Sequence, residues 1–129
     1  MPRGGNVQSG KKECFKMFKC AEARYETNAV VIKLLGDFCY DTVGPVYPFV
    51  NDILKKCPDS LIFDLAKVEF IDSKGAGFFI DVKKCGRNDR GVLLAAVPYN
   101  ILVVLNRLMI AGRFKICKTV AEALEKIPR

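Results

Sequence analysis

The stretch Leu61–Asp81 constrains the fold more than any other part of this sequence. It begins with three apolar residues and keeps a strand-like composition to Ile71, and a short apolar run bounded by turn residues predicts a buried strand. Asp72 and Ser73 follow, and residues of these types ahead of a new periodic segment are typical of a helix N-terminus. We therefore predict a buried strand, a sharp turn and a helix that begins at Ser73.

The predicted position gives Ser73 two possible roles. Its hydroxyl would lie beside the unpaired N–H groups of the first helical turn and at the positive end of the helix dipole. Such a place stabilises an anion, including a phosphate carried by the serine itself. Most serines at helix starts are only caps, so the position alone allows either a structural serine or a modified one.

Strands and helices alternate along the rest of the chain. Apolar, β-branched runs predict further strands over residues 14–23, 29–35, 92–97 and 114–117. Apolar residues at helical spacing predict helices over 44–57, 73–85, 99–110 and 119–127. The first two strands are expected to form a hairpin. The order β-β-α-β-α-β-α-β-α then predicts an α/β fold whose small mixed sheet is largely parallel, with about four helices packed on it.

Glycine residues and polar segments set the expected boundaries. Gly36 is predicted to end the second strand, residues 37–42 to form a loop, and Gly112 to follow the helix over 99–110. Residues 1–12 are polar and rich in glycine, and we expect a disordered tail there. Residues 13–129 are long enough for one domain with a single core.

The composition excludes several classes of function. Lys and Arg number 21 against 14 Asp and Glu, a net charge of +7, but no dense basic block with interleaved aromatic residues indicates direct nucleic-acid binding. The six cysteines form no C-x-x-C pair and the chain has no histidine, so neither a metal site nor a His-dependent hydrolase is predicted. We expect reduced, buried cysteines and no cofactor. No apolar run reaches the ~18 residues of a membrane helix, which favours a cytoplasmic protein without membrane insertion.

The segment that follows the central strand also resembles a known family. An aliphatic strand with Asp64-Leu65 precedes Val68-Glu69-Phe70-Ile71-Asp72-Ser73-Lys74-Gly75-Ala76-Gly77. This string is similar to the signature of the STAS domain, and specifically of bacterial anti-sigma factor antagonists, in which Asp-Ser-x-Gly opens a helix. The similarity extends from about residue 30 to residue 127. Two departures are Cys39, where the family often has an aspartate, and Ala76, where a leucine is common.

The resemblance implies a regulatory protein without catalysis of its own. It would bind a kinase-type anti-sigma factor when unphosphorylated, and phosphorylation of Ser73 by that serine kinase would switch it off. A phosphatase is a further partner that this scheme admits, and the oligomeric state stays open. The resemblance implies a partner-binding surface made of Asp72, Ser73, Lys74, Gly75, Ala76, Gly77, Asp37 and Asp41.

Alternatives remain open from the sequence. The same domain serves as a stressosome scaffold or as the soluble subunit of a lipid transporter. A nucleotide-binding regulatory domain is a third alternative, because Gly75-x-Gly77 follows a strand, although the full phosphate-binding motifs are absent. These two glycines either allow tight packing of the turn on the sheet or leave room for a partner. On the predicted helix over 99–110, Val103 and Ile110 face away from the apolar stripe and weakly indicate a contact surface.

Overall fold

The computed structural model describes residues 15–18, 21–26, 29–56, 58–85 and 91–127, and for residues 15–18 and Cys85 it describes the backbone alone. The tail predicted over residues 1–12 lies outside the described residues. None of the described helices is long and apolar enough to cross a membrane.

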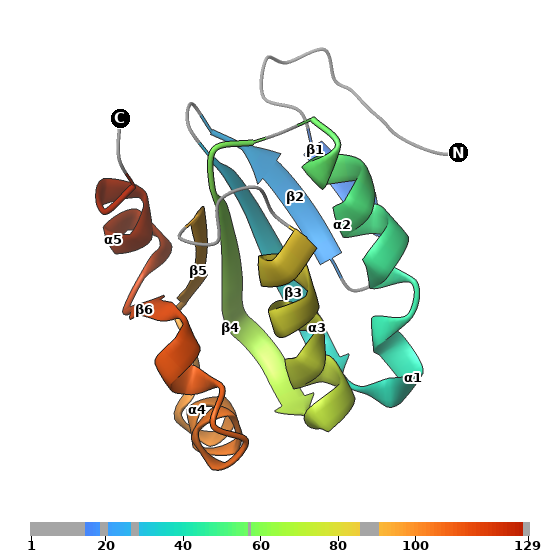
Figure 1. Ribbon diagram of the computed structural model, residues 1–129, viewed down its shortest axis with the longest axis vertical. Coiled ribbons are helices and arrows are strands. Elements are labelled where there is room, and N and C mark those ends of the chain that lie inside the picture. The colour runs from blue at the N-terminus through green and yellow to red at the C-terminus, as the bar shows by residue number, and fades with distance from the viewer. Residues whose placement is uncertain (1–14, 19–20, 27–28, 57, 86–90, 128–129) are drawn as a thin grey trace.

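The described residues form six strands, which lie in sequential order in one mixed sheet (Figure 1). The strands β1, β2 and β3 are antiparallel neighbours, whereas β3, β4, β5 and β6 are parallel. This confirms the predicted largely parallel sheet with an opening hairpin. The bounds are β1 Phe15–Phe18, β2 Ala21–Tyr25, β3 Val30–Phe38, β4 Leu61–Ile71, β5 Val92–Ala95 and β6 Lys115–Cys117.

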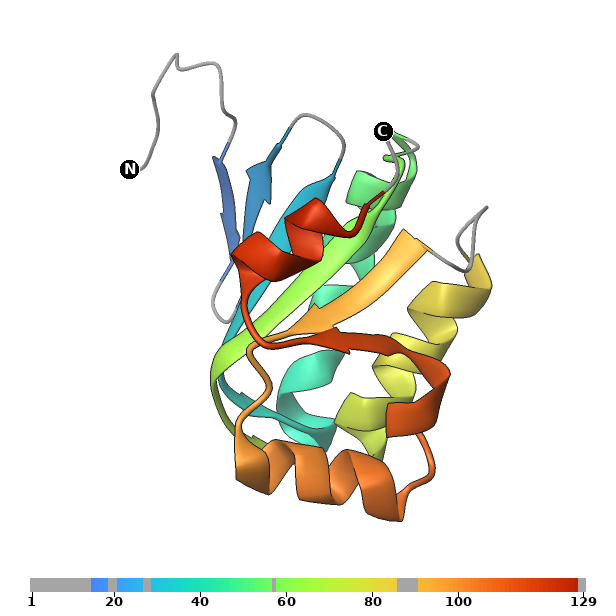
Figure 2. The ribbon, with the colours of Figure 1, turned by 90° about the vertical axis from the view of Figure 1, so that its left-hand side faces the viewer.

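Helices cover the two faces of the sheet unequally. α1, α2 and α3 lie on one face, and α5 crosses the opposite face near one end (Figures 1 and 2). α4 lies at the end of the molecule where the parallel strands terminate (Figure 2). The bounds are α1 Tyr40–Val43, α2 Val46–Leu54, α3 Ser73–Cys85, α4 Tyr99–Arg107, α5 Val120–Glu125 and the 3₁₀ turn η3 Ala111–Arg113.

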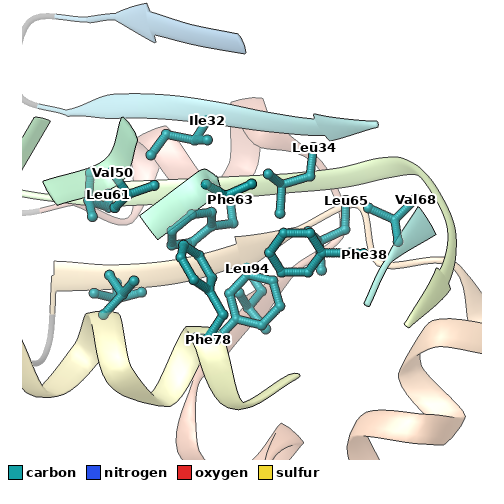
Figure 3. Close-up of a cluster of buried hydrophobic side chains, with 14 of the residues drawn as sticks. Ile32, Leu34, Phe38, Val50, Leu61, Phe63, Leu65, Val68, Phe78 and Leu94 are labelled. Carbon is teal, nitrogen blue, oxygen red and sulfur yellow. The ribbon is translucent and has the colours of Figure 1, made fainter. Parts of the chain in front are cut away.

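The larger core lies between the sheet and α1 to α4. Its centre is aromatic: Phe38, Phe63, Phe78 and Phe79 are fully buried, and their rings meet mostly edge to face (Figure 3). Such pairs add about 0.5–1.5 kcal/mol each to the effect of burial alone. A smaller core under α5 contains Ile62, Leu93 and Ala123 among others. Both faces of the parallel strands are therefore apolar at the α5 end, as their continuous hydrophobic runs predict.

The single strand predicted over residues 14–23 is wrong. Two strands occupy this region, and Phe18 lies opposite Ala21 in an antiparallel register. Only the second of them, β2, pairs with β3. An antiparallel pair cannot be one continuous strand, and the apolar composition of the region does not show where the two strands divide.

Two predicted boundaries after β3 are also wrong. Gly36 does not end the strand: it has a φ of +77°, and pairing with β4 continues beyond it to Phe38. Glycine adopts this left-handed conformation without strain, which lets the strand absorb a local irregularity. Within the predicted loop 37–42, α1 begins at Tyr40. Its first turn is held locally, since the Thr42 hydroxyl donates a hydrogen bond to the carbonyl oxygen of Asp37 at 2.8 Å.

The helix predicted to continue to residue 110 ends at Arg107. The left-handed residue beyond it is Met109, with a φ of +62°, and not the predicted Gly112, which lies in η3. The N–H of Ile110 donates to the carbonyl oxygen of Leu105 at 2.9 Å, which satisfies one of the helix's last acceptors. Sequence composition favoured glycine for this role, but the hydrogen-bonded reversal uses a methionine.

Candidate functional site

The strand that leads to the site carries two irregularities in its pairing. Between Lys33 and Leu35, and again between Gly36 and Asp37, β4 advances by one residue more than β3. Each extra residue is a β-bulge, which bends the strand and redirects its side chains. As a result Val68 and Ile71 point into the core, while Phe70 between them is exposed. The bulges thus bring an aromatic side chain to the surface immediately before the turn.

Asp72 fixes the turn from β4 into α3. One carboxylate oxygen, Oδ1, accepts a hydrogen bond from the N–H of Gly75 at 2.9 Å, which is a helix N-cap interaction. The other oxygen, Oδ2, accepts one from the N–H of Tyr40 at 3.0 Å. The carboxylate therefore connects the start of α3 to the start of α1, which lies 32 residues earlier in the chain.

The same contacts change the acidity of the cap. The N–H of Gly75, followed by those of Tyr40 and Lys74, lowers the pKa of Asp72 below its ordinary value of 3.8 against the opposing effect of burial. Hydrogen bonds to the charged form favour ionisation. Asp72 is consequently a carboxylate at neutral pH, and its hydrogen bonds stabilise the turn wherever it is ionised.

Ser73 is the first residue of α3 and is exposed. The cap is therefore Asp72, and Ser73 stands one position inside the helix with its side chain at the surface. Lys74, the next residue, is exposed too. An anion on Ser73 would share the helix N-terminus with the carboxylate of Asp72, which already accepts the N–H of Gly75. Modification of the hydroxyl would therefore add charge beside an existing charge.

The two glycines of the first turns have different surroundings. A Cβ atom at Gly75 would lie 2.0 Å from the carbonyl oxygen of Phe38 and 2.8 Å from its carbonyl carbon, so only glycine allows this approach of α3 to β3. A Cβ atom at Gly77 would meet nothing within 4 Å. Gly75 accordingly has a packing role, whereas the space at Gly77 is open. Ala76 between them is fully buried in the core.

The structure brings the predicted site residues to one end of the sheet. Asp37 lies beside Phe70 in the parallel register of β3 and β4, and Asp41 lies in α1. Both carboxylates are exposed, and α1 contacts α3. Cys39 is partly buried at the start of α1, where its N–H donates to the Thr42 hydroxyl at 2.9 Å. Cys39, which stands where the family often has an aspartate, is therefore part of a local turn at the start of α1.

Three exposed aromatic residues near this turn were missed from the sequence: Tyr40, Phe70 and Tyr99. Phe70 was assigned to a buried strand because its apolar neighbours are buried, and only the bulges of β4 reveal its exposure. The predicted contact residues Val103 and Ile110 are in contrast partly buried. Of the cysteines whose side chains are described, Cys117 is buried as predicted and Cys39 only partly so.

No group of three or more Cys, Asp or Glu residues in the described part of the chain has the arrangement of a metal site. The chemical groups that the turn presents are instead a hydroxyl, carboxylates, one ammonium group and phenyl or phenol rings.

The fold is that of a single α/β domain, and comparison with known proteins identifies its family. Residues 21–123 match the STAS domain, so the chain belongs to the STAS domain family. Among curated proteins, no sequence matches this chain significantly.

Solved structures share the fold at low sequence identity. An anti-sigma factor antagonist from Mycobacterium paratuberculosis has a TM-score of 0.77 at 16% identity, over 83% of this chain and 92% of its own. The anti-sigma factor antagonist SpoIIAA in its unphosphorylated form has a TM-score of 0.69 at 18% identity, over 83% and 95%. A putative anti-sigma factor antagonist from Thermotoga maritima has a TM-score of 0.69 at 20% identity, over 92% and 96%. At these identities the likeness concerns the fold.

Proposed function

We propose that this protein is an anti-sigma factor antagonist that binds a kinase-type anti-sigma factor when Ser73 is unmodified and releases it when Ser73 is phosphorylated. The observation that carries the proposal is the exposed hydroxyl of Ser73 at the first position of α3, directly after the capping Asp72. Membership of the STAS family supports it. So does the likeness to anti-sigma factor antagonists, one of them named for its unphosphorylated form.

The physical basis of the switch is the added charge. A phosphoserine carries about −1.5 to −2 charges at neutral pH. The helix N-terminus tolerates such an anion within the free protein. A partner that covers Ser73 must strip water from the phosphate and accept its charge, and each ~1.4 kcal/mol of that cost weakens binding tenfold. Modification would therefore release the partner without unfolding the antagonist.

In this scheme the protein contributes recognition and the partner contributes the chemistry. Asp72 keeps the helix start in place, while Lys74, Gly77, Asp37 and Asp41 lie around the serine as contact residues. A phosphatase would return Ser73 to its unmodified form. No residue of the antagonist is required to act as acid, base or nucleophile other than the Ser73 hydroxyl that receives the phosphoryl group.

The test begins with identification of the partner. Tagged parent protein is used to capture its partner from the native host, mass spectrometry identifies a kinase-type anti-sigma factor, and the purified pair is studied by calorimetry. Ser73→Asp is expected to abolish measurable binding, because it places a carboxylate at the interface. Ser73→Ala is expected to retain binding and to accept no phosphate from ATP and the partner.

Thr119→Asp supplies a matched control for the added charge. Thr119 is an exposed residue at the N-cap of α5, on the opposite face of the sheet, where its hydroxyl oxygen accepts the N–H of Glu122 at 3.0 Å. Aspartate is also a good N-cap residue, so this variant should fold and should bind the partner as the parent does. Equal binding by Ser73→Asp and the parent would refute the switch. Capture of a permease instead of an anti-sigma factor would indicate the transporter use of the domain.

A further inference from the structure

We propose that the partner is anchored by three aromatic side chains, Tyr40, Phe70 and Tyr99, and that it presents to them an apolar surface with a basic rim. We call these three residues the aromatic rim. The inference rests on the proposed function and specifies which part of the molecule provides the binding energy. Phosphorylation of Ser73 would then control binding, and the contacts of the aromatic rim would supply the binding energy.

The three aromatic side chains are unusually exposed. Tyr40, Phe70 and Tyr99 are 70%, 51% and 81% exposed, and they are the aromatic side chains among the exposed large hydrophobic residues of the described chain. A single exposed apolar residue is ordinary. Three exposed aromatic residues around one segment are not, because large apolar side chains that gather on a surface mark contact sites.

Three separate elements bring these residues to the same end of the molecule. Phe70 belongs to the last residues of β4, whose bulges turn it outward. Tyr40 begins α1, and its N–H donates to the carboxylate of Asp72. Tyr99 begins α4, where the next residue, Asn100, donates from Nδ2 to the carbonyl oxygen of Glu69 at 3.3 Å. The backbone of Tyr40 and the residue after Tyr99 are thus hydrogen-bonded to the segment Glu69–Asp72, to which Phe70 itself belongs. This segment lies immediately before Ser73, at the end of the molecule where α1, β4 and α4 meet (Figures 1 and 2).

Tyrosine and phenylalanine are well suited to provide binding energy in a protein interface. They are enriched at the centres of protein interfaces, where a few such residues account for most of the binding energy. Each supplies a large rigid surface with few side-chain torsions to fix, so little entropy is lost when a partner covers it. Side chains held on a sheet and on two helix starts are well placed for this role.

The local charge identifies the kind of partner. Residues 37–41, 69–74 and 98–100 contain four carboxylates and one lysine, within a chain whose net charge is +7. Asp37, Asp41 and Glu69 are all exposed. Carboxylates around aromatic rings repel the phosphates of nucleic acids and of anionic lipids, so the surface favours a basic protein over either. A partner with lysine or arginine residues around an apolar hollow would complement it.

A phosphate can weaken binding even to such a partner. A phosphate on Ser73 would compete with the adjacent carboxylate of Asp72 for the positive end of α3, and like charges at close range disfavour each other. Asp72 also holds the N–H of Tyr40. The modification would therefore loosen one anchor of the aromatic rim, in addition to the cost of dehydrating the phosphate itself.

Alanine substitutions test the aromatic rim in the binding assay described above. Tyr40→Ala and Phe70→Ala are each expected to weaken the affinity for the purified anti-sigma factor at least about tenfold, and Tyr99→Ala several-fold. Met109→Ala is the matched control, since Met109 is 80% exposed beyond the opposite end of α4 and should not affect binding. Thermal unfolding must show that all four variants are folded. Raising the salt concentration should weaken the parent complex, and Asp37→Asn with Asp41→Asn should reduce that salt dependence.

The outcomes separate this inference from the proposed function. If Ser73→Asp abolishes binding while the three alanine variants bind like the parent, the aromatic rim is refuted and the switch stands. If the alanine variants lose affinity while Ser73→Asp does not, the switch is refuted and the rim stands. If sedimentation shows that the parent self-associates and that Phe70→Ala dissociates it, the surface belongs to a second copy and the inference is wrong.

Discussion

The two glycines at the start of α3 provide the sharpest test of how the site is built. At Gly75 an added methyl group would lie 2.0 Å from the carbonyl oxygen of Phe38, far inside van der Waals contact. The carbonyl group belongs to the main chain and the position of a Cβ atom is set by the main chain, so no side chain can rotate away to relieve the overlap. Gly75→Ala therefore requires α3 to move by more than 1 Å, about the difference between 2.0 Å and ordinary contact.

The expected cost follows from this displacement. Overpacking within a well-packed region typically costs about 1–3 kcal/mol, and strain on the Asp72 cap adds about 1 kcal/mol. The better helix propensity of alanine offsets about 1 kcal/mol of this destabilisation. We expect Gly75→Ala to lower the free energy of unfolding by about 1–3 kcal/mol, a substantial fraction of the 5–15 kcal/mol that is typical of a domain.

Gly77→Ala is the matched comparison, because a Cβ atom there meets nothing within 4 Å. The helix-propensity gain should then appear alone and raise the free energy of unfolding by up to about 1 kcal/mol. Urea unfolding at neutral pH measures both variants against the parent. Gly75→Ala that is as stable as Gly77→Ala would contradict the packing role of Gly75. The partner-binding assay adds a second readout: if the partner approaches the open side of Gly77, Gly77→Ala stabilises the fold and weakens binding.

Three further changes test the turn and the core beneath it. Asp72→Asn should lower the free energy of unfolding by about 1 kcal/mol at neutral pH, since an amide oxygen replaces only one of the two carboxylate acceptors. Because folding lowers the pKa of Asp72, the carboxylate stabilises the parent fully above the unfolded value of 3.8, and this stabilisation is lost as the pH falls through the lowered pKa of the folded state. The difference in stability between variant and parent should therefore shrink below about pH 4. Tyr47→Phe removes the 2.6 Å hydrogen bond that the Tyr47 hydroxyl of α2 donates to Asp81 Oδ2 of α3. Because this hydrogen bond is exposed, thermal unfolding should show that the free energy of unfolding falls by at most about 1 kcal/mol. Phe78→Ala should cost about 3–5 kcal/mol in urea unfolding, and a loss below 1 kcal/mol would show that the aromatic core is not as closely packed as its ring contacts indicate.

Local signals were sufficient to predict the framework of the fold. The apolar run from Leu61 and the Asp72-Ser73 pair predicted the central strand and a helix beginning at Ser73, as the structure has them. The reason is that a buried parallel strand and a capped helix start each leave a strong pattern within a few residues. The hairpin and the parallel order of the later strands followed from the alternation of elements.

The missed features depend on contacts between distant residues. The bulges of β4 exist only in register with β3, and without them Phe70 is indistinguishable from a core residue in the sequence. The short helix α1 depends partly on Asp72, 32 residues away. Phe78 is fully buried because it packs against other elements, among them α2, whose Tyr47 ring lies edge to face with it at 4.9 Å. No single-segment pattern carries this information.

The residues around Ser73 therefore form two groups, one facing the protein interior and one facing solvent. Asp72, Gly75 and Ala76 face the protein: they cap the helix, allow its approach to β3 and fill the core. Ser73, Lys74 and the aromatic rim face solvent. Substitutions in the first group should change the free energy of unfolding, and binding only as a consequence, whereas substitutions in the second should change binding at nearly constant stability. A serine at this position suits a switch of this kind, because the unmodified turn is held by the hydrogen bonds of Asp72, whereas a phosphate on Ser73 would add charge both to the surface and beside that carboxylate.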